Sequence, residues 1–329
     1  MKVSALFGSD DALERVYGKG RRKKIEGCTQ LYASNVNRDN FCEHAPNLGE
    51  VEAIFSTWGM PLLSPEQLNS MPRLGAVFFA GGSVQHFARP LLERGIVVVS
   101  AWQANAIPVS EFTLAQILLA TKGYFRNSHG YASPSQCLTD PHFKGNFGET
   151  VAILGAGAIG RRVIELLRPF NLKVIVFDPF LNEEAAVTLG VEKVTLEAAF
   201  ERAYVVSNHL ADLPETVGLL NGGLFERMRP NGTFINTGRG RTVDEEALIR
   251  TLQAQPDITA LLDVTYPEPP VAGSLFYTLS NAHLSTHIAG SIGDELARMA
   301  DYCLEEFMSW EKNAPLKYAV SLAMLETMA

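Results

Sequence analysis

A glycine-rich turn in the middle of the chain constrains the fold more than any other feature. It lies between two apolar stretches, with an amphipathic helical segment after it, and reads Gly155-Ala156-Gly157-Ala158-Ile159-Gly160. Glycine at these three positions permits a tight turn, close approach of a ligand to the backbone, and close packing of the helix on the strand. The segment therefore predicts a strand–turn–helix–strand unit of a parallel α/β sheet. Its free N–H groups at the start of the helix can bind a phosphate.

An acidic residue, Asp178, follows the second apolar stretch and lies 18 residues after Gly160. This is close to the spacing of about 20 residues at which a carboxylate binds the ribose hydroxyls of NAD. No Arg or Lys stands beside Asp178 in the sequence to accept the 2′-phosphate of NADP. A glycine turn alone is often only structural, but the order strand, turn, helix, strand and acid favours a dinucleotide site. We therefore predict an NAD-binding site.

The composition is typical of a folded, soluble chain. Hydrophobic residues make up 47% and charged residues 19% of the 329 residues, a length that suggests about two domains. The net charge of -8 argues against a nucleic-acid-binding surface, and we interpret the one basic run, residues 21–24, as a solvated face or loop. Residues 1–11 lack the apolar core of a signal peptide, and no stretch of about 18 apolar residues could span a membrane. We expect a cytoplasmic protein without membrane or nucleic-acid partners.

Cysteine and histidine spacing predicts no metal site. The cysteines, which form no C-x-x-C pair, are Cys28, Cys42, Cys137 and Cys303, and we expect them to be reduced. His283 and His287 are four residues apart, but the segment between them is predicted to be a strand, which would not present both rings to one metal.

Apolar strands alternate with helical segments along the whole chain, as in parallel α/β domains. The predicted strands are residues 3–7, 51–55, 75–79, 96–100, 174–177, 204–207, 233–236 and 259–263. The predicted helices include residues 65–70 and 85–94, a long amphipathic helix from Val109 to about Lys122, and a terminal helix over about 293–312. A polar loop follows the long helix and extends through Phe147. We interpret it as a hinge or an oligomer contact.

Three polar segments follow predicted strands of the second half and carry Arg239, Glu268 and His287. Each residue alone has an ordinary structural explanation, as a surface cation, a loop acid and a satisfied buried ring. The carboxyl ends of parallel strands meet at one edge of a sheet, so these three side chains would reach one crevice. Together they form a constellation suited to moving a proton and a hydride.

The chain resembles the D-2-hydroxyacid dehydrogenases, which include phosphoglycerate dehydrogenase, glyoxylate and hydroxypyruvate reductases, D-lactate dehydrogenase and formate dehydrogenase. The resemblance covers nearly the whole chain and rests on residues 105–111, 155–160, 236–240, 262–270 and 287–290. It implies an α/β fold of two Rossmann-like, doubly wound parallel-sheet domains, with the NAD domain inserted into a flavodoxin-like substrate domain. The implied boundaries are 1–103 for the first part of the substrate domain, 104–291 for the NAD-binding domain, and 292–329 for a C-terminal helix returning to the substrate domain.

The resemblance also implies an activity, hydride transfer between NAD(H) and C2 of a small D-2-hydroxy acid or 2-oxo acid. Arg239 would bind the substrate carboxylate and polarise the keto oxygen, since its rigid fork suits a planar anion. His287 would give a proton to that oxygen during reduction, and Glu268 would hold the other ring nitrogen. Formate dehydrogenase has glutamine where Glu268 stands, so Glu268 argues against that activity. Phosphoglycerate oxidation stays open.

Further contacts are implied in the same way. The cofactor-binding set is Gly155, Gly157, Ala158, Ile159, Gly160, Asp178, Thr237, Gly238, Asp263 and Gly290. The substrate loop contains Gly81, Gly82 and Ser83, whose backbone would hold the carboxylate together with Arg239. Trp58, Met60 and Trp102 follow neighbouring strands, and the identity of the substrate is left open.

Three positions depart from the family's usual pattern. Thr286 replaces a proline before the histidine, and Ala211 and Leu213 replace a proline and a threonine beside the adenine pocket. These departures affect cofactor contacts and not the fold. The resemblance implies a homodimer formed through the NAD domains. A second class of function, an NAD(H)-sensing binding protein or corepressor of the same family with little turnover, has the same residues and is kept as the alternative.

Overall fold

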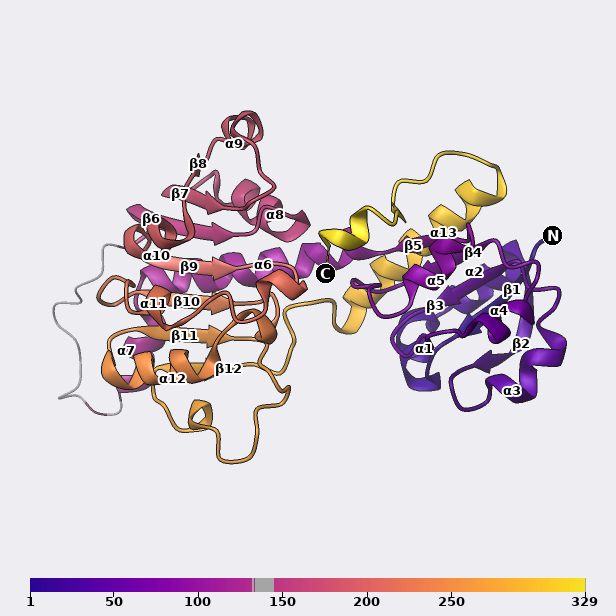
Figure 1. Ribbon diagram of the computed structural model, residues 1–329, viewed down its shortest axis with the longest axis horizontal. Helices are drawn as coiled ribbons and strands as arrows, with labels where there is room; N and C mark the ends of the chain where they lie inside the picture. Colours follow the sequence, from indigo (N-terminus) through magenta and orange to yellow (C-terminus); the bar gives the residue numbers. More distant parts are fainter. Residues whose placement is uncertain (132, 134–144, 329) are drawn as a thin grey trace. The chain divides into compact units, whose positions relative to one another are not determined.

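The computed structural model divides the chain into two compact units. The structure describes residues 1–131, 133 and 145–328. Unit 1 comprises Met1–Ala106 and Ser291–Ala329, and unit 2 comprises Ile107–Gly290 (Figure 1). Unit 2 is therefore inserted into the sequence of unit 1. The predicted fold class, two α/β domains with one inserted into the other, is confirmed.

Unit 1 is built on a six-stranded sheet in the order β13-β5-β4-β3-β1-β2, in which only β13 is antiparallel to its neighbour. The strands are β1 (Val3–Phe7), β2 (Gln30–Val36), β3 (Ala53–Ser56), β4 (Ala76–Phe79), β5 (Val97–Ser100) and β13 (Ala319–Val320). The helices are α1 (Asp10–Tyr17), α2 (Arg21–Cys28), α3 (Phe41–His44), α4 (Pro65–Asn69), α5 (Ala88–Glu93) and α13 (Leu296–Glu311). The first five strands follow the flavodoxin-like order, which reverses between β1 and β3.

Both faces of this sheet are buried under apolar side chains. Successive residues of a strand point to opposite faces, so each strand contributes to both cores. Phe7 and Phe79 belong to one core, and Phe55 and Phe78 to the core on the other face, which α13 covers with residues such as Phe307. Continuous apolar strands in the sequence are the signature of this two-sided burial. The predicted ranges of these strands therefore agree with the observed ones to within two residues at each end.

The basic run is part of a helix and not of a loop. Residues 21–24 form the start of α2, where Arg21 Nε and Lys24 Nζ lie 3.9 Å and 3.3 Å from Asp301 Oδ1 of α13. The run is thus a solvated face of a helix that packs on unit 1 through the buried Ile25.

Unit 2 is built on a seven-stranded, fully parallel sheet in the order β12-β11-β10-β9-β6-β7-β8 (Figure 1). The strands are β6 (Phe147–Leu154), β7 (Asn171–Phe177), β8 (Glu192–Lys193), β9 (Val205–Asn208), β10 (Thr233–Asn236), β11 (Thr259–Leu262) and β12 (Ala282–Leu284). The helices are α6 (Trp102–Thr121), whose first five residues belong to unit 1, α7 (Tyr124–Gly130), α8 (Ala158–Leu167), α9 (Glu183–Leu189), α10 (Leu196–Arg202), α11 (Gly222–Phe225) and α12 (Glu245–Ala254). This is the Rossmann order, and its reversal between β6 and β9 marks the crevice where such sheets bind ligands.

The long helix differs from its prediction. It begins at Trp102, seven residues before Val109, and contains Pro108. Proline favours the first turn of a helix because it has no N–H, so the sequence indicates a start near this position. In the structure Ala104 and Ala106 are buried, and their packing keeps the helix continuous on the N-terminal side of Pro108.

Several predictions concern features that the structure covers only in part. Most of the polar loop before Phe147, and Cys137 within it, lie outside the described residues. The other three cysteines, Cys28, Cys42 and Cys303, are free thiols. The described residues contain no group of three or more His, Cys, Asp or Glu side chains able to hold a metal ion. None of their helices has the length and hydropathy needed to cross a membrane.

Candidate active site

The glycine turn between β6 and α8 leaves its backbone open to a ligand. Gly155 has φ +92°, and a Cβ there would lie 2.8 Å from the His209 carbonyl oxygen; a Cβ at Gly160 would lie 2.0 Å from the carbonyl oxygen of Gly155. A Cβ at Gly157 would meet nothing within 4 Å. The N–H groups of Gly157 and Ala158 donate to no other described residue. The turn therefore fits the pyrophosphate of a dinucleotide, which needs close backbone approach and free donors.

Asp178, at the end of β7, fixes the geometry of this turn. Its Oδ2 accepts a hydrogen bond from Ala156 N at 2.6 Å, and its Oδ1 accepts from the backbone N–H groups of Phe180 and Leu181 at 2.7 and 3.0 Å. The carboxylate is partly exposed, and Oδ2, which accepts one hydrogen bond, retains a free lone pair. It can therefore hold the turn and still accept hydrogen bonds from ribose hydroxyls.

Sequence reasoning missed a cation near this acid. Lys193 Nζ donates to the Leu181 carbonyl at 2.6 Å, in the turn that Asp178 caps. Lys193 lies 15 residues after Asp178 in the sequence. It comes close to this turn because β8, which contains it, pairs with β7. Only the pairing of short β8 with β7 could have indicated it.

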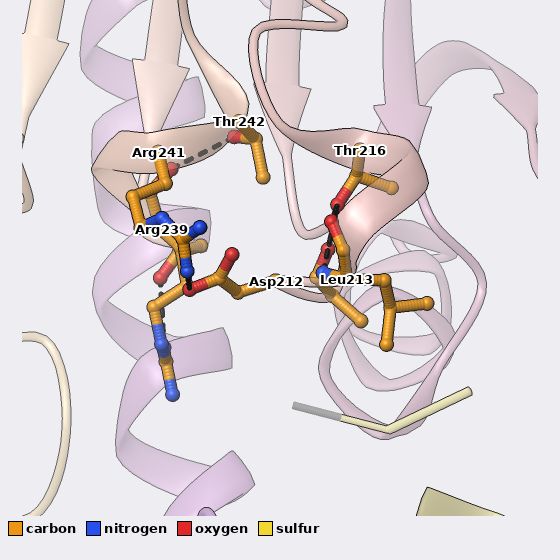
Figure 2. A network of polar contacts seen from close by, with 8 residues as sticks. Asp212, Leu213, Thr216, Arg239, Arg241 and Thr242 are labelled. Carbon is orange, nitrogen blue, oxygen red and sulfur yellow. Dashed lines mark hydrogen bonds and ion pairs between the residues drawn. The ribbon is translucent and has the colours of Figure 1, made fainter. Parts of the chain in front are cut away.

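Arg239 follows β10, and local hydrogen bonds hold both its backbone and its side chain. The Thr242 hydroxyl donates to the Arg239 carbonyl at 2.8 Å, and Arg239 Nη1 donates to the Gly238 carbonyl at 2.8 Å (Figure 2). Burial lowers the pKa of the guanidinium, while the nearby charges of Asp212 and Glu268 raise it. Arg239 stays protonated, because guanidinium remains charged in proteins, and is thus a partly desolvated cation suited to binding a carboxylate.

His287 and Glu268, which follow β12 and β11, are in direct contact. The distance from His287 Nδ1 to Glu268 Oε1 is 2.7 Å, and both side chains are about half exposed. The contact leaves Nε2 of the ring as the nitrogen available to a substrate. A carboxylate on Nδ1 fixes the orientation of the ring and points Nε2 away from Glu268.

Asp263 supports the loop that carries His287. Its side chain is 2% exposed and accepts from Ser285 Oγ at 2.6 Å and from the backbone of Ile288 and Ala289 at 2.9 Å each. His287 itself has φ +57°, a conformation that is unfavourable for a non-glycine residue and that these bonds help to hold. The loop that follows Thr286 is therefore held by the Asp263 carboxylate.

The loop after β9 also keeps a tight turn without its usual proline and threonine. Thr216 Oγ1 donates to the Ala211 carbonyl at 2.6 Å and accepts from Leu213 N at 2.9 Å (Figure 2). The same loop brings Asp212 Oδ2 to 3.4 Å from Arg241 Nη1, and Arg241 lies over the Tyr266 ring. The positive charge of Arg241, which lies two residues after Arg239, is therefore already paired with a carboxylate.

Thr237 takes part in a buried polar chain beneath the turn. Its hydroxyl lies 3.3 Å from His209 Nδ1 and 3.2 Å from Thr113 Oγ1, and His209 Nε2 lies 2.9 Å from Ser207 Oγ. Burial lowers the pKa of His209 to about 3, so this ring is neutral and structural. The neighbouring Gly238 is buried, and Gly290 is the last residue of unit 2.

Glu245 binds the backbone of the segment that leads to Glu268, and its burial predicts a pH dependence of the free energy of unfolding. Its Oε1 accepts from Tyr266 N at 2.7 Å, and burial raises its pKa to about 7. A raised carboxyl pKa stabilises the folded state fully below the unfolded value of about 4.3, and this stability is lost as pH rises through about 7. Glu245→Gln keeps the acceptor and removes the charge. We expect it to stabilise the protein by about 1 kcal/mol more at pH 8 than at pH 5.

Thermal unfolding of both proteins at the two pH values measures this difference. The exposed Glu246, next to it on α12, is the matched control, and Glu246→Gln should show no such dependence. An equal change in Tm at pH 5 and pH 8 for Glu245→Gln would contradict the account.

In unit 1, the segment after β4 presents free N–H groups. Ser100 Oγ donates to the carbonyls of Gly81 and Gly82 at 3.0 and 2.7 Å, which turns the backbone of this loop. The N–H groups of Gly82 and Ser83 donate to no other described residue. A Cβ at Gly81 would lie 2.4 Å from the Phe79 ring, so glycine is required there. Such a loop can bind one carboxylate through its backbone.

The comparison with known proteins agrees with this geometry. The family model described as "D-isomer specific 2-hydroxyacid dehydrogenase, NAD binding domain" matches residues 117–289, which is more than half of the chain. The chain belongs to the D-isomer-specific 2-hydroxyacid dehydrogenase family. The matched part of this dehydrogenase family member coincides with most of unit 2 and contains its NAD-binding turn.

Relatives of known name extend the similarity beyond unit 2. D-3-phosphoglycerate dehydrogenase of Bacillus subtilis is 30% identical over 262 residues, which is 79% of this chain and 50% of the relative. The chain spans about half the length of the curated dehydrogenases it matches. Two solved structures share the fold: a phosphoglycerate oxidoreductase from Rhizobium etli (TM-score 0.80, 22% identity, 97% and 98% of the two chains) and an NADPH-dependent glyoxylate/hydroxypyruvate reductase from Sinorhizobium meliloti (TM-score 0.76, 21% identity, 100% and 99%).

Proposed function

We propose that the protein is an NAD-dependent D-2-hydroxyacid dehydrogenase, an enzyme acting on the CH–OH group of its donor. The main support for the proposal is the 2.7 Å contact between His287 Nδ1 and Glu268 Oε1. Glu268 follows β11, which pairs with β10, the strand that the partly buried Arg239 follows. A binding protein of the same family can contain the same residues, but its function does not depend on an imidazole held by a carboxylate next to a desolvated arginine. An enzyme that reduces a carbonyl needs both.

Each residue of the proposed site has a separate role in the reaction. NAD(H), when bound, accepts or supplies the hydride. Arg239 binds the carboxylate of the 2-oxo acid and stabilises the negative charge that develops on the keto oxygen. His287 donates the proton from Nε2 to that oxygen in reduction and takes it back in oxidation, while Glu268 keeps the ring oriented through Nδ1. In unit 1 the N–H groups of Gly82 and Ser83 bind the carboxylate.

The cofactor contacts follow from the glycine turn. Gly155, Gly157, Ala158, Ile159 and Gly160 surround the pyrophosphate. Asp178 accepts hydrogen bonds from the adenosine ribose hydroxyls. We propose that Thr237, Gly238, Asp263 and Gly290 line the nicotinamide end, with Asp263 acting both there and on the His287 loop.

The position of Asp178 predicts a cofactor preference. We expect NADPH to bind at least about tenfold more weakly than NADH, because a 2′-phosphate beside this carboxylate meets like-charge repulsion. Asp178→Asn keeps one accepting oxygen for the turn and removes the charge, so it should narrow the gap between the two Kd values measured by calorimetry. The Sinorhizobium meliloti neighbour is NADPH-dependent, so preference varies within this fold.

Lys193 provides the control for that titration. If it served the 2′-phosphate, Lys193→Met would weaken NADPH binding and spare NADH. We expect Lys193→Met to leave the ratio of the two Kd values unchanged, since Nζ is engaged with the Leu181 carbonyl. Equal Kd values for the two cofactors in the wild type would contradict the role of Asp178.

The proposal is tested with a panel of 2-oxo acids mixed with NADH and the purified protein, read as loss of NADH absorbance. Turnover that depends on both oxo acid and protein supports the enzyme. Tight NADH binding with no turnover of any oxo acid would instead favour the alternative, an NAD(H)-sensing corepressor or binding protein.

We further propose that the protein is a cytoplasmic homodimer that associates through unit 2. The ends of the polar loop carry exposed apolar side chains, Tyr124 and Tyr131 on one side and Phe147 on the other. Exposed aromatic groups of this kind are typical of subunit contacts. We expect a dimer by light scattering at micromolar concentration, and a shift towards monomer for Phe147→Asp. A monomeric wild type would contradict this.

A further inference from the structure

The segments that follow β3, β4 and β5 form one continuous edge of the sheet of unit 1. Residues 57–64, 80–87 and 101–106 follow these three neighbouring strands. Thr57 Oγ1 donates to the Ala80 carbonyl at 2.8 Å, and the His86 ring nitrogen Nε2 lies 3.4 Å from the Met60 carbonyl oxygen. We call these three segments the uncharged edge, for the reason given next. The free N–H groups of Gly82 and Ser83 belong to the middle one of the three segments.

The uncharged edge contains no Lys, Arg, Asp or Glu. Its one titratable side chain is that of His86. The nearest arginine along the chain, Arg89, is paired with Glu326 at 2.8 Å. The edge instead offers apolar surface, because Trp58 is 41% and Leu62 is 61% exposed.

This distribution of charge limits what a substrate can carry besides its own carboxylate. The free N–H groups of the loop suffice for one anion. If the substrate carried a second anionic group, such as a phosphate or a distal carboxylate, that group would lose its hydration on the uncharged edge. The edge has no cation to pair with it, so its transfer from water is unfavourable. In unit 2 the extra arginine, Arg241, already faces Asp212 and lies over Tyr266.

We infer that the physiological substrate is a 2-oxo monocarboxylate with an uncharged, mainly apolar side chain, and not a phosphorylated or dicarboxylic oxo acid. The inference rests on the proposed function. It sets this chain apart from those of its relatives that are named as phosphoglycerate dehydrogenases. Within the proposed site, the carboxylate binds at the Gly82 and Ser83 N–H groups, and the side chain of the substrate lies against the uncharged edge.

Matched pairs of substrates test the inference in the wild-type protein. Hydroxypyruvate is compared with 3-phosphohydroxypyruvate, and 5-methyl-2-oxohexanoate with 2-oxoglutarate, in which a carboxylate replaces the isopropyl group. We expect kcat/KM to be about 100-fold higher for the uncharged member of each pair. Charged members reduced within about threefold of their partners, or better, would overturn the inference and leave the dehydrogenase activity standing. No turnover of any of the four would overturn the proposed function itself.

A cation placed on the uncharged edge gives an independent test. Trp58→Lys and Leu62→Lys each add one positive charge, and both positions have the exposure that such a side chain needs. We expect either variant to raise the kcat/KM of the charged member relative to its partner by about tenfold. The control is Val187→Lys, an equal charge change at an exposed position of α9 in unit 2, which should leave the ratio unchanged.

NADH titration by calorimetry shows whether each variant is folded and binds cofactor. If both edge variants bind NADH normally and neither changes the ratio, the side chain of the substrate does not lie against this edge and the inference fails. A change in the ratio of the same size in Val187→Lys would also overturn it, because long-range charge would then explain the effect.

Discussion

His287→Ala is expected to lower kcat for 2-oxo acid reduction by about 10³-fold or more and to leave the Kd for NADH within about twofold. Without the ring, no group of the proposed site supplies a proton to the keto oxygen. The cofactor turn lies at the ends of β6 and β7 and does not involve His287. Steady-state kinetics and calorimetry with NADH measure the two effects separately.

Glu268→Gln separates the charge of the acid from its hydrogen bond. Glutamine can still accept a hydrogen bond from Nδ1, so the ring keeps its orientation, but the neighbouring negative charge is lost. We expect Glu268→Gln to lower kcat for reduction far less than His287→Ala does, because the ring and its orientation are kept and only the charge beside it is lost. Near-wild-type turnover of His287→Ala on the best substrate would show that another group is the proton donor.

Arg239→Ala is expected to lower kcat/KM by about 10³-fold, through both weaker oxo acid binding and poorer polarisation of the carbonyl. The guanidinium is partly desolvated, so its electrostatic effect is larger than that of an exposed cation. Arg239→Lys should recover only part of the loss, since a point charge cannot replace the two-pronged contact with a carboxylate.

Arg241 offers the matched control for this loss. It lies two residues away, carries the same charge and is exposed, but it faces Asp212 and Tyr266. We expect Arg241→Ala to change kcat/KM by less than about threefold. A loss in Arg241→Ala as large as that in Arg239→Ala would contradict the assignment of the substrate anchor.

The sequence was sufficient for most of the fold because its central strands are buried on both faces. The strands at Val3–Phe7 and Thr233–Asn236 lie at their predicted positions. The edge strand β2, Gln30–Val36, could not be recognised, since only its last residue is fully buried and its polar residues give no apolar run. The start of α6 was wrong because Pro108 is tolerated where tertiary packing holds the first turns.

The sequence predicted that the candidate site residues follow neighbouring strands, but it did not predict the contacts between them. The order of parallel strands indicates that Glu268 and His287 reach the same sheet edge, yet the 2.7 Å contact depends on the loop after β12. That loop is shaped by the buried carboxylate of Asp263, whose three partners lie 22 to 26 residues later in the sequence. Ser100 and Lys193 were missed for the same reason, because they act through backbone carbonyls that no spacing pattern identifies.

Transfer of deuterium from C4-deuterated NADH to the product tests the central claim most directly. The protein is incubated with labelled NADH and an uncharged 2-oxo monocarboxylate, and the product is analysed by mass spectrometry and chiral chromatography. The account predicts a D-2-hydroxy acid with one deuterium at C2, formed at a rate that falls by about 10³-fold in His287→Ala. NADH that binds but transfers no deuterium to any oxo acid, or a labelled product of the L configuration, would contradict it.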